Sequence, residues 1–295
     1  MRYRFLLLCI ILIGFSITPI VSAQSEFNTP PYDIGNPILI DLYINPTTGD
    51  DANDGLSPET AFQSLDTAWR QIPMGEMLTT GYRLNLADGT YPENILPTYW
   101  ESRYGTSDAP IIIQGAGINT LLAGNVNVYD THYIYFLDLS ISYGADAFHC
   151  ELCDHLLIRG VTMVGADPET YNARETLKVN QSQYVYIENS DISGAEDNAI
   201  DFVAVQYGHI LNNRVHNAGD WCGYVKGGSA YIRVEGNHFY DCGNGGFSAG
   251  QGTGFQFMTP PWIHYEVYFI TIVNNTVTDA YGAGIGVQGA YNVLV

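Results

Sequence analysis

Apolar and polar positions repeat along the chain with a period near 22 residues. Seven segments share the pattern, and their first residues lie 22, 29, 23, 24, 38 and 22 positions apart. They begin at Tyr133, His155, Tyr184, Tyr207, Tyr231, Phe269 and Tyr291. In the first six segments, the third and the eighth residue after the start are apolar. Period-two alternation within such short runs predicts β-strands.

A nearly constant period returns the chain to the same place one layer further on, so that each coil covers the apolar face of its neighbour. Asparagines recur between the two apolar positions, where this residue tolerates left-handed backbone and bonds to the next coil. They are Asn189, Asn212, Asn213, Asn237, Asn274 and Asn275. Neither the leucine consensus of leucine-rich repeats nor the unit length of a propeller is present. The pattern predicts an all-β protein, a right-handed parallel β-helix solenoid.

The segment before the repeats predicts a strand from Ile38 to Ile44 and a short helix from Ser64 to Ile72. Because a solenoid needs its open end covered, we expect this helix to cap the N-terminal end. We place the β-helix domain at residues 37–295, with its cap at about 37–80, and interpret residues 24–36 as a linker. The chain stops where another coil would begin, so we expect it to be truncated there.

The first residues predict export. Arg2 and Arg4 precede an apolar run, and Val21 to Ala23 supplies the small residues that a signal peptidase reads, so residues 1–23 are expected to be a cleaved signal peptide. The run is short and interrupted for a membrane anchor, and no later segment is long and apolar enough to span a bilayer. The mature chain is therefore expected to be secreted, extracellular or periplasmic, without a membrane span.

The charge balance narrows the choice of partners. The chain has 31 acidic residues against 11 lysines and arginines, a formal net charge of −20. Such a charge argues against nucleic acid and anionic membranes as partners. It also repels acidic polysaccharides unless a cation bridges the two. We expect a monomer.

Five cysteines are present, and one of them, Cys9, leaves with the signal. The others are Cys150, Cys153, Cys222 and Cys242. Export permits disulfides, whereas the Cys-x-x-Cys spacing also occurs in metal and redox sites. Core packing, disulfides and a metal or redox site all stay open from the sequence.

One outward position per coil forms a column in such a stack, with successive residues about 4.8 Å apart. We align the last strand of each coil by its inward apolar pair. The alignment gives the column His149, Lys178, Asp201, Lys226 and Gly286, with Ser248 or Gln256 as candidates in the long coil. The column thus contains both lysines of the chain. Acids precede these strands, namely Glu175, Glu196, Asp197 and Asp220.

Two interpretations of this column stay open. Opposite charges on neighbouring strands form a ladder worth about 0.2–1 kcal/mol per pair, and flanking carboxylates raise the pKa of a lysine, which is wrong for a base. A bound cation would reverse the local field, favour the neutral lysine and tether a uronate carboxylate. Oxygen ligands at this density suit Ca²⁺.

Two insertions favour a cleft beside the column, because long loops on a rigid scaffold are often functional. One runs from Asp167 to Arg174, and the other surrounds Pro260 to Tyr265. Trp262 and Tyr265 either stack on sugar rings or pack over their own loop.

The residues at this point resemble a known superfamily. Tyr43 to Gly55 and Ser57 to Leu65 are similar to the opening segment of many secreted, pectin-lyase-like β-helix proteins, and the coils after Tyr133 are similar to their repeats. The resemblance covers nearly all of the expected mature chain. It is specific for the fold and says little about the reaction.

Within that superfamily, the chemistry most resembles family 9 polysaccharide lyases, which use a lysine base and an aspartate-lined Ca²⁺ site. The resemblance implies that Lys226 is the base and that Asp197, Asp201 and Asp220 bind calcium. The chain departs from the family pattern because Glu196 and Asp197 stand where the family has paired aspartates. Asp220 also stands farther from the lysine than in the family.

A second resemblance is to family 6 alginate lyases, whose glutamate-to-lysine strand is similar to Glu175-x-x-Lys178. Neither resemblance identifies the acid, for which Arg214 and His264 are candidates.

The sequence therefore predicts a calcium-dependent lyase that cleaves a uronate-containing polysaccharide by β-elimination. The catalytic candidates are Lys226 and Lys178. The substrate-binding candidates are Arg214, Trp262, His264 and Tyr265. The metal-binding candidates are Glu175, Glu196, Asp197, Asp201 and Asp220. A non-catalytic adhesin or glycan-binding module, a uronate epimerase and a glycoside hydrolase are the alternatives.

Overall fold

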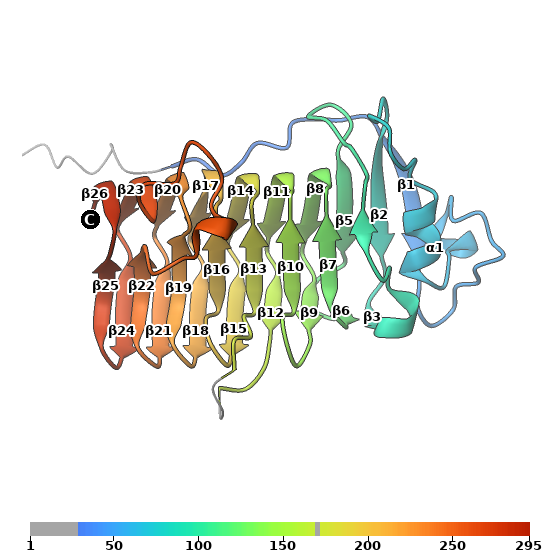
Figure 1. The fold of residues 1–295 in the computed structure, drawn as a ribbon. Coiled ribbons are helices and arrows are strands. Elements are labelled where there is room, and N and C mark those ends of the chain that lie inside the picture. Colours follow the sequence, from blue (N-terminus) through green and yellow to red (C-terminus); the bar gives the residue numbers. More distant parts are fainter. Residues whose placement is uncertain (1–28, 169–171) are drawn as a thin grey trace, which may run out of the picture. The chain divides into compact units, whose positions relative to one another are not determined.

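The described strands form three sheets, and each complete coil contributes one strand to every sheet (Figure 1). The computed structural model describes residues 29–168 and 172–295, and residues 31–295 form the unit described below. Neighbouring strands pair in parallel, and the chain passes through the three sheets in turn. The predicted parallel β-helix is confirmed.

Sheet A contains ten of the described strands: β1 (Leu39–Ile44), β2 (Gly81–Leu86), β5 (Ile111–Gly115), β8 (His132–Leu137), β11 (Asp154–Arg159), β14 (Gln183–Glu188), β17 (Gln206–Leu211), β20 (Ser229–Glu235), β23 (Val267–Val273) and β26 (Ala290–Leu294). Sheet B contains β3 (Gly89–Pro92), β6 (Thr120–Ala123), β9 (Ser140–Ser142), β12 (Thr162–Val164), β15 (Asp191–Ala195), β18 (Arg214–Ala218), β21 (His238–Cys242) and β24 (Thr276–Ala280). Sheet C contains β4 (Trp100–Glu101), β7 (Val126–Tyr129), β10 (Phe148–Glu151), β13 (Leu177–Asn180), β16 (Ile200–Val203), β19 (Trp221–Lys226), β22 (Gly245–Ala249) and β25 (Ala283–Val287).

The repeated apolar positions form the core in the predicted register. In sheet A, the apolar residue three positions after the start of each repeat pairs with its counterpart in the next coil, and all of these residues are buried. They are Phe136, Ile158, Ile187, Ile210, Val234 and Ile272. The eighth residues align in the same way in sheet B, from Ile141 to Val277. Each coil therefore buries its apolar face against the next one.

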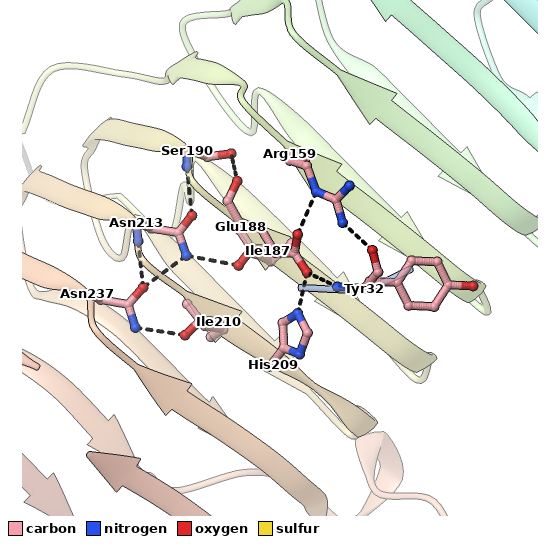
Figure 2. A network of polar contacts seen from close by, with 9 residues as sticks. All are labelled: Tyr32, Arg159, Ile187, Glu188, Ser190, His209, Ile210, Asn213 and Asn237. Atoms are coloured by element: carbon pink, nitrogen blue, oxygen red, sulfur yellow. Dashed lines mark hydrogen bonds and ion pairs between the residues drawn. The ribbon is translucent and has the colours of Figure 1, made fainter. Parts of the chain in front are cut away.

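The predicted asparagine corner is present between sheets A and B. Asn189, Asn212 and Asn274 have φ values of 48°, 55° and 56°, the left-handed region that asparagine tolerates. The residue one position later bonds across coils: the backbone N–H of Asn213 donates to Oδ1 of Asn237 at 2.9 Å (Figure 2). The side chain of Asn237 also donates to a carbonyl oxygen of the preceding coil, so the ladder satisfies polar groups that the corner buries.

The predicted helix forms at the N-terminal end of the unit. Helix α1 (Leu65–Arg70) begins after Ser64, whose hydroxyl accepts a hydrogen bond from the N–H of Thr67 at 3.1 Å. Its apolar side is buried, and the ring of Trp69 lies 5.1 Å from that of Trp100. Short 3₁₀ turns are present at η1 (Pro58–Thr60), η2 (Glu93–Ile95) and η3 (Phe255–Phe257).

The four described cysteines form two disulfides, a possibility that the sequence left open. Cys150 pairs with Cys153, and Cys222 pairs with Cys242. All four side chains are also buried in the core. The second disulfide joins strand β19 of sheet C to β21 of sheet B, which fixes the strand that bears Lys226.

The residues that begin the repeats stack on the outside of sheet A. Tyr133, His155, Tyr184, Tyr207, Tyr231 and Phe269 have φ values from 50° to 62°. Successive rings lie 4.0 to 5.2 Å apart and are nearly parallel. Stacking and sheet pairing hold this unusual backbone conformation in every coil.

A segment near the N-terminus crosses the outer face of sheet A. The N–H of Tyr32 donates to Glu188 Oε1 at 2.7 Å, and Arg159 donates to the carbonyl oxygen of Tyr32 at 2.5 Å (Figure 2). Glu188 also pairs with Arg159 and with His209, at 2.6 and 2.5 Å. The ring of Tyr32 stacks on Tyr186 at 4.4 Å. Tyr32 belongs to the stretch that the sequence predicts to be a linker, residues 24–36. In the structure, this residue is hydrogen-bonded to the coils.

The predicted signal peptide at residues 1–23 lies outside the described residues, and so does the middle of the 167–174 insertion. Within residues 29–168 and 172–295, none of the helices combines the length and apolar character that crossing a bilayer requires.

Candidate active site

The outer face of sheet C carries a cleft of about 460 Å³. Its floor comes from β13, β16 and β19, and its walls include Ala173 of one predicted insertion and residues 252–254 of the other long loop. The polar side chains that dominate the cleft are Glu175, Lys178, Asp197, Asp201, Tyr224 and Lys226. One residue of the first predicted insertion and the start of the second long loop therefore lie beside the column, whereas residues 260–265 do not line the cleft.

The predicted column is correct except in one coil. His149, Lys178 and Asp201 pair in register, but Asp201 pairs with Tyr224, whereas Lys226 lies opposite Val203. The next position is Ser248, followed by Gly286.

The error has a steric cause. The inward pair of this strand is Gly223 and Val225 rather than Val225 and Gly227, so the alignment by apolar residues moved by two positions. A side chain at Gly223 would begin 3.1 Å from the ring of Phe247, which fills this part of the core. Lys226 nevertheless lines the same cleft as Lys178.

Lys178 lies between two buried carboxylates. Its Nζ is 3.0 Å from Glu175 Oε2 and 3.3 Å from Asp201 Oδ2, ion-pair distances without full hydrogen-bond geometry at Glu175. Burial opposes the charged form of Lys178, but Asp201 and Glu175 outweigh it and raise the pKa of the ammonium group. Lys178 therefore remains a cation, as the ladder interpretation expects for a lysine among acids.

Lys226 has different neighbours. Its Nζ donates to the hydroxyl of Tyr224 at 2.8 Å, lies 4.3 Å from the centre of that ring, and is 3.5 Å from Gln251 Oε1. Among the residues that the structure describes, no carboxylate is within 4.0 Å of this amine. Burial, together with the charges of Asp201 and Glu175, raises the pKa of Tyr224, so its hydroxyl keeps its proton.

Two carboxyl groups of the cleft have pKa values raised toward neutral pH. Burial, opposed by the charge of Lys178, raises the pKa of Glu175 to about 7. Burial and the charges of Asp220 and Asp201 raise the pKa of Asp197 to about 6. Such values mark groups whose surroundings disfavour charge, which is common where a site is arranged for chemistry.

Besides Glu175 Oε2, which faces Lys178, two acceptors of the cleft lack a hydrogen-bond donor. Within the described part of the chain, no group donates a hydrogen bond to Asp201 Oδ1 or Asn180 Oδ1, although both atoms are buried. Because unsatisfied buried acceptors are uncommon, a ligand hydroxyl that reached these atoms would complete the site.

The carboxylates do not fit the predicted calcium ion well. Calcium needs several oxygen ligands around one point, but the ammonium of Lys178 lies between Glu175 and Asp201. Glu196 faces Arg174 at 3.6 Å, and Asp220 is not among the residues that line the cleft. In residues 29–168 and 172–295, no three His, Cys, Asp or Glu side chains form a metal-binding group.

The four predicted substrate-binding residues lie away from the cleft lining. Arg214 is in sheet B, where it pairs with Asp191 at 3.1 Å. Trp262 and Tyr265 pack against Tyr268, with ring centres 5.1 and 5.5 Å apart, which is the second of the two interpretations that the sequence left open.

His264 is tied to the same cluster, since its N–H donates to the hydroxyl of Tyr268 at 2.8 Å. Tyr224 and Phe257 are among the cleft residues that the sequence interpretation missed. Tyr224 was hidden by the register error, and Phe257 belongs to a loop whose path no periodicity predicts. The alternation of Trp221 to Lys226, with a glycine allowed at an inward position, would have identified Tyr224.

Comparisons with known proteins agree with this fold. The sequence model of the family described as "Right handed beta helix region" matches residues 146–295. No curated protein sequence matches the chain.

Among solved structures, an alginate lyase from Paenibacillus sp. str. FPU-7 aligns with a TM-score of 0.54 and 15% identity, over 87% of this chain and 99% of that one. A pectin methylesterase mutant in complex with a hexasaccharide aligns with a TM-score of 0.51 and 13% identity, over 82% of this chain and 80% of that one. ORF18 of Geobacillus virus E2 aligns with a TM-score of 0.50 and 11% identity, over 85% of this chain and 62% of that one. At these identities, the likeness shows the fold alone, and the resemblance to family 9 in particular stays a prediction.

Proposed function

We propose that this chain, which belongs to the right-handed β-helix family, binds an acidic polysaccharide over sheet C and cleaves it by β-elimination. One observation carries the proposal: the two lysines of the chain share one cleft but have opposite surroundings. Lys178 is held between carboxylates, whereas Lys226 contacts the hydroxyl of Tyr224 and an amide.

β-Elimination on a uronate requires a positive charge beside the carboxylate, because neutralising that group acidifies the neighbouring C5–H. Lys178 is suited to this role, since its raised pKa keeps it charged. Glu175, with a pKa of about 7, is partly protonated at neutral pH. A substrate carboxylate therefore meets less negative charge in the cleft than the number of acids suggests.

The remaining two steps need a base and an acid. Lys226, which has no carboxylate partner among the described residues, removes the C5 proton in its neutral form. The electron pair of that C–H bond forms the C4–C5 double bond as the C4–O bond breaks. Tyr224, which keeps its proton because its pKa is raised, donates it to the departing oxygen. General acid and base groups of this kind contribute about 10²- to 10⁴-fold each.

Hydrolysis by Glu175 together with Asp201 is less compatible with the same geometry. A hydrolase needs two carboxyl groups that flank the sugar, with space between them for the substrate. In this cleft, the ammonium of Lys178 fills the space between Glu175 and Asp201. An epimerase would share the proton removal, and only its products distinguish it.

Secretion belongs to the same proposal, whereas a calcium ion is the alternative source of the positive charge. Two disulfides in the described part of the chain favour an oxidising compartment, which supports the predicted export. Calcium is implied by the resemblance to family 9, whereas Lys178 already lies between two of the proposed ligands. Turnover that survives EDTA would assign the required positive charge to Lys178, and turnover that EDTA abolishes would assign it to a metal.

The test is incubation of the purified chain with polygalacturonate, alginate and chondroitin, with Ca²⁺ and with EDTA, while the ultraviolet absorbance of unsaturated uronate is followed. We expect a rise with one polymer, a loss of about 10²-fold or more in Lys226→Ala, and no loss in Arg70→Ala, an exposed cation on α1. Absence of a rise with every polymer, while the protein still binds one of them, would instead favour a glycan-binding module.

A further inference from the structure

We propose that Phe257, on the wall of the cleft formed by the long loop before β23, is a stacking platform for a sugar ring next to the reacting one. This inference rests on the proposed function and extends it, because it assigns a subsite for the neighbouring sugar. Neither the repeats nor the lysine column indicates it.

The position of Phe257 carries the inference. Phe257 lines the cleft together with Gly252, Thr253 and Gly254. Lys178 and Lys226 line the floor of the same cleft. Figure 1 shows this part of the chain as the orange loop with a short helical turn, drawn over the strands of sheet C. Phe257 is 53% exposed although it is large and apolar. An apolar ring exposed inside a polar cleft gains by covering the apolar face of a sugar.

The loop that presents Phe257 is fixed by Glu266. One carboxylate oxygen accepts from the N–H of Thr253 at 2.8 Å, and the other accepts from the hydroxyl of Thr253 at 2.7 Å and from the N–H of Gly227 at 3.0 Å. Gly227 directly follows Lys226. Glu266 thus joins the wall of the cleft to the end of the strand that bears the proposed base, so that the platform and Lys226 hold a fixed separation.

The aromatic residues at the far end of the loop have a different role. Trp262 lies against the rings of Tyr231 and Tyr268, at 5.6 and 5.1 Å, and therefore attaches the loop to the coils. The part of the loop that lines the cleft is residues 252–254 and Phe257. The cleft thereby combines one exposed aromatic ring, two amines and the amides of Asn180 and Gln181. This mixture suits a sugar acid, which has an apolar ring face, hydroxyls and a carboxylate.

The chain offers a matched control in the same helical turn. Phe255 is 79% exposed but does not line the cleft. Removing either phenylalanine takes an exposed ring from η3, and only one of these changes alters the proposed subsite. Kinetics on the polymer that supports turnover therefore separates a general effect on the loop from a loss of stacking.

We expect Phe257→Ala to raise KM about three- to tenfold, with kcat changed by less than about twofold, because the stacking of one ring contributes up to about a tenfold change in affinity. Phe255→Ala should leave both constants within about twofold of wild type, and Phe257→Trp should restore KM. Equal effects of the two alanine variants, or a change in kcat alone, would overturn the platform.

A binding measurement distinguishes failure of this inference from failure of the proposed function. Affinity electrophoresis in gels that contain alginate, polygalacturonate or chondroitin requires no turnover. Retardation of wild type and of Phe255→Ala, but not of Phe257→Ala, supports the platform even if no polymer is cleaved. A wild-type chain that none of the polymers retards, or a Phe257→Ala chain retarded as strongly as wild type, would overturn it.

Discussion

Replacing Asp197 by asparagine tests whether the acids of the cleft serve to hold the coils together. Asp197 is only 7% exposed, and burial with the charges of Asp220 and Asp201 raises its pKa from 3.8 to about 6. Its charged form is therefore less favourable in the folded chain than in the unfolded one. Asp197→Asn removes that cost, so it should stabilise the protein, whereas the loss of a stabilising charge ladder would have the opposite sign.

The magnitude follows from the size of the rise in pKa. From 3.8 to about 6, it corresponds to about 3 kcal/mol, since one pH unit is worth about 1.4 kcal/mol. The folded-state pKa is the higher one, so the stability contributed by the protonated carboxyl is complete below about pH 3.8 and is lost as the pH rises through about 6. Asp197→Asn should match wild type near pH 4 and exceed it by up to about 3 kcal/mol above pH 7.

Urea unfolding followed by circular dichroism, repeated from pH 4 to pH 8, measures this difference in the free energy of unfolding. Asp108→Asn is the control, because it removes one negative charge from an exposed position outside the cleft. If Asp197→Asn were less stable than wild type at neutral pH, or if its advantage over Asp108→Asn did not grow with pH, the reasoning would be refuted.

Other variants test the rest of the structure. Lys178→Met leaves two buried carboxylates without their shared cation, so we expect a loss of about 3–5 kcal/mol in the free energy of unfolding measured in urea. Cys222→Ala with Cys242→Ala should lower the unfolding free energy by about 3 kcal/mol, and a reductant should then destabilise this variant less than it destabilises wild type, since the Cys150–Cys153 disulfide remains. Burial disfavours the charged form of Glu188. The hydrogen bonds from His209, Tyr32 and Arg159 outweigh burial and lower the pKa of this carboxyl group. Its stabilisation is present above the unfolded value of 4.5 and is lost as the pH falls through the lower folded value. Glu188→Gln should therefore be less stable than wild type at pH 7 and lose that difference in acid, as thermal unfolding across pH will show.

The fold was predictable because each inward position in sheets A and B repeats at nearly constant spacing and tolerates only apolar residues. Register in sheet C was less predictable, because a coil with a large residue such as Phe247 requires a small neighbour, and Gly223 looks like a turn in the sequence. Predicting the cysteine pairs likewise required the register. Cys222 and Cys242 lie in adjacent coils, and their strands belong to different sheets.

The site was predictable where it belongs to the column and unpredictable where it belongs to loops. Lys178 and Asp201 follow from strand spacing. The path of the long loop depends on Glu266 and on contacts of Trp262, which bring Phe257 to the cleft and turn Tyr265 away. Such contacts between distant residues leave no periodic trace in the sequence.

The segment that contains Tyr32 has a consequence for how the chain unfolds. A solenoid behaves as a one-dimensional array in which each repeat interacts only with its neighbours, so its ends can melt separately. Tyr32 contacts β8 through Tyr135, β11 through Arg159 and β14 through Glu188, which in turn pairs with His209 of β17. Four consecutive coils are therefore connected by the segment around Tyr32, which we call the clasp. We expect them to exchange their amide protons as one cooperative block, and deletion of the clasp to divide that block into separately melting coils.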